Sequence, residues 1–453
     1  MKQVISTLAV LLIPTVLIAS EMQPNVILIM ADDLGYNDLS CYGSREIDTP
    51  VLDQLAREGI RLTSFYAGCT ICTPSRMALL TGMYPVRCGW QGGVVGYGVQ
   101  PQNGLSTQTT TIAEVYKRAG YTTTLIGKWH LGDTAEHSPM AHGFESAFFI
   151  NKSNNQTKKL WRGDSIVADP FDNRQLTEQF TSEAIRFVEA NRDTPFFLYM
   201  PLSAPHFPAQ AHPEWANRTK LGAYGDVVEE MDGRIGMLLS TLTRLEIDDR
   251  TIVVFLSDNG VEPGQKQWAQ SAPFRGLKWS TLEGGNRVPC IIRWPGRIPA
   301  ETVNNQLISA IDLFPTLISA CHLDTPSLKT VLADCDGVNI LESLIKKRYR
   351  RHARNTLLFW HGWGTPQAIR MNQWKLFFDD VQELPGSQQG PVLINLKDDP
   401  AEMTNLSEQH PQRVEEMLAT ARQQLSYLND NAIPLGGPKD SRVKVPATPK
   451  WLD

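Results

Sequence analysis

The segment Cys72-Thr73-Pro74-Ser75-Arg76, followed by Leu80-Thr81-Gly82, is the most restrictive pattern in this sequence. Five specified residues with a second triplet at fixed spacing are far more specific than a lone glycine motif. Thr73 and Pro74 are typical of an N-cap and of the first position of a helix. Residue 72 is therefore expected at a helix N-terminus, where free backbone amides favour anions.

Two other interpretations of Cys72 do not need the whole segment. A cysteine before a helix can be an inert buried thiol, and Cys69 with Cys72 has the C-x-x-C spacing of thioredoxin-like redox sites. Neither interpretation explains the Thr-Pro-Ser-Arg run that follows. The complete segment, rather than the cysteine alone, carries the functional prediction.

Apolar runs on both sides of this segment predict buried strands, and helical patterns separate them. The predicted strands are Val26 to Met30, Thr122 to Ile126, Phe196 to Met200 and Ile252 to Leu256. The predicted helices are Thr111 to Ala119, Gln179 to Ala190 and Gly225 to Leu245. This alternation indicates an α/β fold whose sheet is largely parallel and covered by helices on both faces.

Polar residues follow each of these four runs where the predicted strand ends. They are Asp32-Asp33, Lys128-Trp129-His130, His206 and Asp258-Asn259, in strand order. In open parallel sheets, functional groups gather at the carboxyl ends of the strands. We therefore expect these side chains to meet at one site.

With the Cys72 segment, the span from Asn25 to about Leu406 resembles the formylglycine-dependent sulfatases of the alkaline phosphatase superfamily. The supporting stretches are Ala31 to Gly35, Gly127 to Gly132, Pro205-His206, Ser257 to Gly260, Arg275 to Lys278 and Glu283 to Pro289. The resemblance implies an alkaline-phosphatase-like fold. Its large, mixed and mostly parallel sheet would lie between helices, with a smaller C-terminal antiparallel subdomain.

The resemblance also implies that a maturation enzyme oxidises Cys72 to formylglycine. One hydroxyl of the hydrated aldehyde, activated by a metal, would attack sulfur and release the alcohol. Loss of a proton from the other hydroxyl would then expel sulfate and restore the aldehyde. A serine would instead leave a sulfated enzyme that hydrolyses slowly.

Four side chains with oxygen atoms are predicted to hold the metal together with residue 72: Asp32, Asp33, Asp258 and Asn259. Oxygen ligands suit a hard cation, so Ca²⁺ is favoured over zinc. Mg²⁺ is the less favoured alternative, because ligand type does not separate these two ions. An acidic pair after a strand is often only a helix cap, but the second pair, Asp258-Asn259, favours a metal site. In the family, the counterpart of Asp258 also assists deprotonation of the attacking hydroxyl.

Further catalytic roles follow from the resemblance. Arg76 and Lys128 would steady the formylglycine, and His130 would take the proton whose loss releases sulfate. Lys278 and His206 would bind sulfate and protonate the leaving oxygen. A single histidine at a strand end is usually structural, but two histidines and two lysines at matching positions favour catalysis.

Three residues are predicted to contact the substrate. Ser153 aligns loosely with a family serine that touches sulfate, whereas His361-Gly362-Trp363-Gly364 departs from the family pattern. His361 and Trp363, together with Gln91 to Leu105, are therefore expected to determine the substrate. Aromatic faces can stack on sugar rings, although most tryptophans simply bury area in cores. The predicted substrate is a sulfated carbohydrate.

Two alternative functions remain compatible with these motifs. One is a formylglycine-dependent phosphonate or phosphodiester hydrolase, because the same charges can hold a phosphorus oxyanion. The other is a non-catalytic glycan-binding homologue that never receives its formylglycine.

The remaining features bound the location and the partners of the chain. Lys2 and the apolar run Val4 to Ile18, ending in Ala19-Ser20, predict a signal peptide over residues 1–20, too short for a stable membrane span. The protein is thus expected to be secreted, periplasmic or, in a eukaryote, lumenal. A formal net charge of -5 across 453 residues excludes a generally basic nucleic-acid binder.

A change of pattern near residue 345 predicts a catalytic domain over 21–345 and a C-terminal subdomain over 346–453. Short strands are expected at Thr356 to Trp360, Ala368 to Met371, Trp374 to Phe378 and Val392 to Leu396, before a helix from Pro411 to Leu428. The basic stretch Lys346 to Arg351 at the join favours a solvated linker over a polymer-docking site. Conversion of Cys72 would leave six cysteines, among which Cys321 and Cys335 are the most plausible local disulfide.

Overall fold

The computed structural model describes residues 23–436 except 101–102, 324, 347–353, 379–380, 382, 385–386 and 388–389. The predicted signal peptide and the basic stretch beyond Lys346 lie outside the described residues. No helix in the described part of the chain combines the length and apolar character that a membrane span requires.

A ten-stranded mixed sheet forms the centre of the molecule, in the order β13-β2-β12-β11-β1-β10-β6-β7-β8-β9. Strands β11, β1, β10, β6 and β7 run parallel, whereas β12, β8 and β9 pair antiparallel with their neighbours. The parallel strands are β11 (Thr251–Ser257), β1 (Asn25–Ala31), β10 (Phe196–Pro201), β6 (Thr122–Lys128) and β7 (Ser146–Ile150). The others are β13 (Thr302–Asn304), β2 (Ile60–Leu62), β12 (Cys290–Arg293), β8 (Leu160–Arg162) and β9 (Ser165–Ala168).

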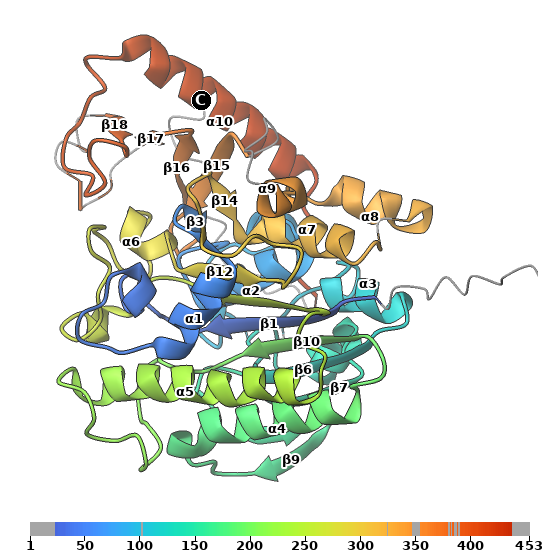
Figure 1. Ribbon diagram of the computed structural model, residues 1–453. Coiled ribbons are helices and arrows are strands. Elements are labelled where there is room, and N and C mark those ends of the chain that lie inside the picture. Colours follow the sequence, from blue (N-terminus) through green and yellow to red (C-terminus); the bar gives the residue numbers. More distant parts are fainter. Residues whose placement is uncertain are drawn as a thin grey trace, which may run out of the picture.

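Two layers of helices bury the two faces of this sheet (Figure 1). Along β1, Val26, Leu28 and Met30 enter one hydrophobic core, whereas Ile27 and Ile29 enter the other. Burial on both faces explains why the central strands are continuous apolar runs. One face packs against α1 (Pro50–Glu58), α4 (Leu176–Ala190) and α5 (Gly222–Arg244). The other packs against α2 (Cys72–Thr81), α3 (Ile112–Arg118) and α7 (Leu313–Ala320).

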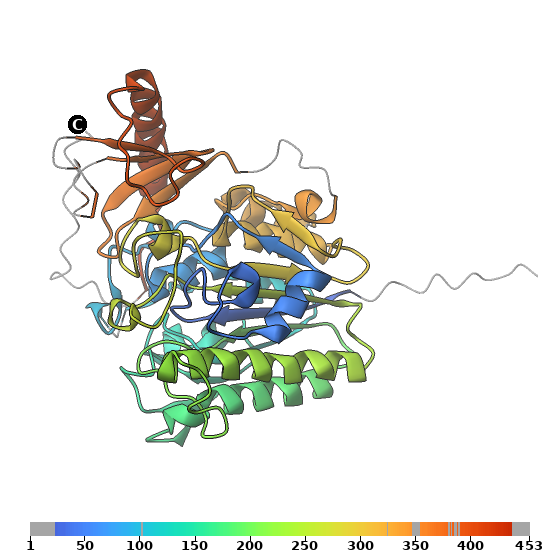
Figure 2. The same ribbon diagram turned by 60° about the vertical axis from the view of Figure 1, so that its left-hand side comes forward.

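A separate four-stranded antiparallel sheet stands beyond the α2 side, covered by a long helix (Figure 2). Its strands are β15 (Thr356–Trp360), β16 (Pro366–Met371), β17 (Trp374–Phe377) and β18 (Val392–Asn395), and the helix is α10 (Pro411–Asp430). The smaller elements are β3 (Phe65–Tyr66), β4 (Val94–Val95), β5 (Gly98–Val99), β14 (Ile308–Ser309), α6 (Glu283–Asn286), α8 (Lys329–Asp334) and α9 (Leu341–Ile345). The predicted fold class is confirmed.

A buried ionic cluster joins this second sheet to the main domain. The Lys375 ammonium on β17 donates to Glu283 Oε1 at 3.0 Å, to Glu402 Oε1 at 2.9 Å and to the carbonyl of Thr281 at 2.7 Å. These three contacts use all the donors of the ammonium group. Lys375 of the second sheet thereby holds segment 281–283, which follows the predicted sulfate ligand Lys278, in place.

The predicted disulfide is wrong, because Cys321 and Cys335 are both free thiols. The thiol of Cys321 lies 3.4 Å from the hydroxyl of Tyr116. That of Cys335 lies 3.2 Å from the carbonyl of Leu332 and makes a local contact instead. Proximity in sequence therefore did not translate into a bridge.

Candidate active site

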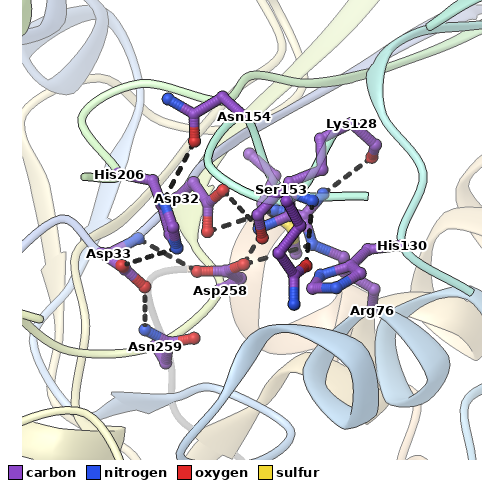
Figure 3. Close-up of polar contacts among 12 residues, drawn as sticks. Asp32, Asp33, Arg76, Lys128, His130, Ser153, Asn154, His206, Asp258 and Asn259 are labelled. Atoms are coloured by element: carbon purple, nitrogen blue, oxygen red, sulfur yellow. Dashed lines mark hydrogen bonds and ion pairs between the residues drawn. The ribbon is translucent and has the colours of Figure 1, made fainter. Parts of the chain in front are cut away.

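The polar residues at the four strand ends converge on one buried cluster (Figure 3). Asp32 and Asp33 follow β1, Asp258 follows its neighbour β11, and His206 lies after β10 on the other side of β1. Lys128 is the last residue of β6. Adjacent parallel strands therefore end at the same edge and bring together side chains that lie up to 226 residues apart.

Cys72 lies at the start of α2, where it is 2% exposed. The expected capping geometry is wrong in detail: the helix begins at Cys72, with Ile71 as its N-cap. The Thr73 hydroxyl instead donates to the carbonyl of His130 and accepts from the amide of Val95. The helix start thus fixes the loop that carries His130.

Burial raises the pKa of the encoded Cys72 thiol to about 12, although Lys128 and Lys278 oppose this shift. Burial also raises the pKa of Cys69 to about 12. A protonated, buried thiol is a poor nucleophile and a poor redox partner. The encoded cysteine pair is thus poorly suited to thioredoxin-like exchange.

Three cations balance the three carboxylates of the cluster. Lys128 Nζ lies 2.6 Å from Asp32 Oδ2, and Arg76 Nη2 lies 2.8 Å from Asp258 Oδ2. Lys278 Nζ lies 2.8 Å from Asp33 Oδ2. Because the charges of these three ion pairs cancel, a bound divalent cation would give the cluster a net positive charge, which suits an anionic ester.

The carboxyl groups of the cluster differ in the direction of their pKa shifts. Burial alone would raise the pKa of Asp32, but Lys128, with further help from His206 and Arg76, holds it well below its usual range. Burial raises the pKa of Asp33 to about 7, against the effect of Lys278. Burial, together with the charge of Asp32, raises the pKa of Asp258 to about 6. Burial disfavours the ionised form of a carboxyl group, whereas a nearby cation stabilises that form.

Two oxygen atoms of the cluster are buried without a hydrogen-bond partner among the described residues: Asp32 Oδ1 and Asn259 Oδ1. Buried polar atoms rarely lack a partner unless an ion or water fills the position. One ligand atom from each of Asp32, Asp33, Cys72 and His206 lies within 4.8 Å of the others. These residues therefore fit a metal ion.

Asp258 and Asn259 are joined to this set of possible ligands by hydrogen bonds with Asp33. The backbone amide of Asp33 donates to Asp258 Oδ1 at 3.1 Å, and Asn259 Nδ2 donates to Asp33 Oδ1 at 2.6 Å. Asp33 itself has a φ of 66°, in the left-handed region that non-glycine residues avoid. Such strain is characteristic of functional positions.

The two predicted catalytic histidines have fixed ring orientations. His130 Nε2 lies 3.1 Å from the carbonyl of Val95, an acceptor, so this nitrogen carries the proton. His130 Nδ1 is buried and has no hydrogen-bond partner in the described chain, so its lone pair is available as a base. Burial, then Lys128 and Arg76, lowers the pKa of His130 well below its usual range.

His206 is oriented by a residue that the sequence did not reveal. Its Nδ1 lies 3.0 Å from Asn154 Oδ1 and 2.7 Å from the carbonyl of Phe207, both acceptors, which leaves Nε2 facing Asp33 at 3.6 Å. Burial, then Lys278, lowers the pKa of His206 well below its usual range. No motif marked Asn154, because its role depends on a contact between distant loops.

A cleft of 600 Å³ opens above the cluster. Its lining includes Cys72, His130, Ser153, His206 and Lys278. Tyr97, Gln156, Glu262 and Trp279 also line the cleft. Glu262 was not predicted, yet its carboxylate lies 3.0 Å from Lys278 Nζ.

The two other predicted substrate residues lie beside this cleft rather than in its floor. Trp363 is 43% exposed and stacks on Trp279, with ring centroids 5.1 Å apart. His361 lines an adjoining cavity of 420 Å³ that shares Lys278 and Trp279 with the main cleft. Trp279 thus separates the two cavities.

Family models match most of the chain. A model described as Sulfatase matches residues 24–323, and one described as N-sulphoglucosamine sulphohydrolase, C-terminal, matches residues 278–431. Together they span both sheets.

Individual relatives agree with the family models. The chain is 34% identical to N-acetylgalactosamine-6-sulfatase of Sus scrofa, over 78% of this chain and 72% of the relative. It is 30% identical to N-acetylgalactosamine-6-O-sulfatase of Bacteroides thetaiotaomicron, over 88% of this chain and 92% of the relative. A solved structure from work on glycosaminoglycan metabolism by Bacteroides thetaiotaomicron superposes with a TM-score of 0.79 at 28% identity, over 90% of this chain and 99% of the other. The chain therefore belongs to the sulfatase family, within the alkaline-phosphatase-like superfamily, and is a sulfuric ester hydrolase.

Proposed function

We propose that the protein is exported and hydrolyses sulfate esters of a sulfated carbohydrate, using formylglycine at position 72 and Ca²⁺. One observation supports this proposal: Cys72 lines the cleft beside buried carboxyl groups, and two buried oxygen atoms of the cluster have no hydrogen-bond partner among the described residues. Two relatives named for N-acetylgalactosamine-6-sulfate hydrolysis support a sulfated amino sugar as the first substrate to test.

The metal would be held by Asp32, Asp33, Asp258 and Asn259 together with residue 72. Three carboxylates and one amide form a hard donor set that favours Ca²⁺ over zinc. The bound ion would polarise sulfate oxygens, and the hydrated aldehyde would supply the attacking hydroxyl. His206 is also near enough to reach the ion, and because Asn154 and the carbonyl of Phe207 hold its Nδ1–H, Nε2 would have to take up a proton before it could act as an acid.

The remaining charged residues would position the reacting groups and move protons. Arg76 reaches both Asp258 and the carbonyl of Lys128, so it connects two sides of the nucleophile pocket. His130, with a free Nδ1, would accept the proton whose loss releases sulfate. Lys278 would hold a sulfate oxygen, and His206 would protonate the leaving oxygen.

The domain division follows the same proposal. Residues 21–345 would form the catalytic domain and residues 346–453 the C-terminal subdomain, with Ser153 contacting sulfate and Trp363 and His361 contacting the sugar. A formylglycine-generating enzyme would act on Cys72 before the chain folds, because the thiol is 2% exposed in the fold.

The proposal is tested by assaying purified protein whose peptide mass shows that the Cys72 thiol has become an aldehyde. Free sulfate is measured with N-acetylgalactosamine 6-sulfate, an aryl sulfate and a matched aryl phosphate, with Cys72→Ala as the inactive control. We expect sulfate release from both sulfate esters and much slower phosphate release. Faster turnover of the phosphate ester would instead support a phosphoester hydrolase, and an unconverted cysteine in natively produced protein would support a glycan-binding homologue.

A further inference from the structure

Three aromatic side chains from distant segments form one cluster at the rim of the cleft: Tyr97, Trp279 and Trp363. Trp279 and Trp363 stack with centroids 5.1 Å apart, and Tyr97 lies edge-on to Trp363 at 5.3 Å and to Trp279 at 6.1 Å. Tyr97 is 57% exposed and Trp363 is 43% exposed. Exposed aromatic surface of this extent, next to a cleft, is characteristic of a binding site.

The backbone around this aromatic cluster is built to admit the rings. A Cβ atom on Gly362 would lie 2.3 Å from the Trp279 ring, and one on Gly98 would lie 3.0 Å from the Trp363 ring. Trp279 adopts a φ of 79°, which a bulky residue rarely does, and its amide donates to the carbonyl of Thr70 at 2.9 Å. A strained tryptophan held by its backbone indicates a functional position rather than incidental packing.

Two members of the aromatic cluster line the same cleft as Cys72. Trp279 directly follows the sulfate ligand Lys278, and both line the cleft together with Tyr97. A sulfate group over Cys72 would therefore place the ring that carries it in the cleft. The neighbouring ring of the same glycan would then meet the aromatic faces.

The charges at the rim select against a second anion. Among the described residues lining the cleft, Glu262 is the carboxylate on this side, and its side chain is 27% exposed. The one lysine there, Lys278, is already shared between Glu262 and Asp33. A sulfate or carboxylate on the neighbouring ring would approach Glu262 without a free cation to offset the repulsion.

We propose that Tyr97, Trp279, Trp363 and Glu262 form a subsite for an uncharged sugar ring linked to the sulfated one. The ring stacks on the aromatic cluster, and its hydroxyl groups donate to the Glu262 carboxylate. This inference rests on the proposed function and deepens it. It assigns the preferred substrate to glycans in which the sulfated residue is joined to a neutral sugar rather than to a uronic acid or a second sulfated ring.

The test compares three substrates that share one reacting group: a 6-sulfated hexosamine alone, the same residue linked to a neutral hexose, and the same residue linked to a hexuronic acid. For the matured wild type, kcat/KM is expected to be about tenfold higher for the neutral disaccharide than for either other substrate. Tyr97→Ala and Trp363→Ala should remove the advantage over the monosaccharide. Tyr427→Ala, a tyrosine 51% exposed on α10, is the matched control and should keep it.

Glu262→Gln separates charge from shape. Its ratio of neutral to uronic disaccharide should fall from about tenfold to less than about threefold. Because the readout is a ratio, any general loss caused by a displaced Lys278 cancels. A second measurement uses tryptophan fluorescence in the Cys72→Ala protein, where the neutral disaccharide should change the emission and Trp363→Ala should reduce that change.

The outcomes distinguish the subsite from the function. Turnover of the monosaccharide with no preference among the three substrates would overturn the subsite and leave the proposed function standing. Preference for the uronic disaccharide would also overturn it. Absence of sulfate release from every substrate, including the aryl sulfate, would overturn the proposed function itself.

Discussion

Two buried ionic clusters lie on either side of segment 278–283, and they differ in how completely their polar atoms are paired. The interface cluster comprises Tyr66, Glu283, Arg370, Lys375 and Glu402. Every side-chain nitrogen and oxygen of these residues that is fully buried has a partner. In the active-site cluster, by contrast, Asp32 Oδ1, Asn259 Oδ1 and His130 Nδ1 have no hydrogen-bond partner among the described residues, although Arg76 Nη2 lies 3.6 Å from Asp32 Oδ1.

This difference separates a structural role from a chemical one. Burying a charge costs several kcal/mol unless it is paired, so a cluster kept only for stability is expected to satisfy all its groups. A site that must bind an ion and an ester is expected to contain polar atoms that have no hydrogen-bond partner within the protein. Backbone strain does not follow this division, because Glu402 of the interface cluster has a positive φ of 58°, as Asp33 and His130 of the active-site cluster also do.

The largest expected effect is a loss of activity with little change in the stability of the fold. Cys72→Ala should lower kcat/KM for any sulfate ester by about 10⁴-fold or more, because it removes the nucleophile. Its free energy of unfolding, measured by denaturant titration, should change by less than about 1.5 kcal/mol, since only one sulfur atom is lost. Wild-type turnover by this variant would contradict the formylglycine assignment.

The second effect sharpens the comparison between the clusters. Lys375→Met should destabilise the fold by about 3–5 kcal/mol, because it leaves buried carboxylates without their shared cation. Lys128→Met removes the partner of Asp32 in the same way, but added Ca²⁺ should restore part of its lost stability. Denaturant titrations with and without Ca²⁺ measure both variants, and equal recovery, or none in either, would contradict the division of roles.

The third effect comes from the metal itself. Because the ion would bind the folded chain and not the unfolded one, Ca²⁺ at 100 times its Kd should stabilise the protein by about 2.7 kcal/mol. Asp258→Ala should lose this response together with activity. Calorimetric unfolding of chelated and Ca²⁺-loaded protein provides the measurement, and zinc at full occupancy in elemental analysis would overturn the choice of ion.

The smallest effect is a pH dependence located in the interface cluster. Burial raises the pKa of Glu402 from 4.5 to about 7, against the effect of Lys375. A raised carboxyl pKa in the folded state contributes stability that is present below about pH 4.5 and lost as pH rises through 7. The free energy of unfolding should therefore fall between pH 5 and about 8, and Glu402→Gln should reduce that slope. An unchanged slope would show that Glu402 does not titrate there.

The central strands and the strand-end residues could be predicted because their signals are local. Each buried parallel strand is a continuous apolar run, and the residue after it lies at a known edge of the sheet. The four short strands of the second sheet and α10 were found for the same reason.

Features that depend on distant contacts could not be predicted. Asn154 orients His206 across 52 residues of sequence, and Glu262 forms an ion pair with Lys278, which follows it by 16 residues. The capping prediction failed because the Thr73 hydroxyl accepts from the amide of Val95, 22 residues away, rather than from an amide of its own helix. Spacing within a segment says nothing about such competition.

Sulfate release from N-acetylgalactosamine 6-sulfate, followed through one cycle of Ca²⁺ removal and return, tests the central claim most directly. The active-site cluster, two of whose buried oxygen atoms have no hydrogen-bond partner among the described residues, is predicted to form a catalytic metal site. Matured protein should therefore release sulfate, lose this activity on chelation and regain it with Ca²⁺. Full activity in the metal-free protein, or no sulfate release from the matured and Ca²⁺-loaded protein, would contradict the account.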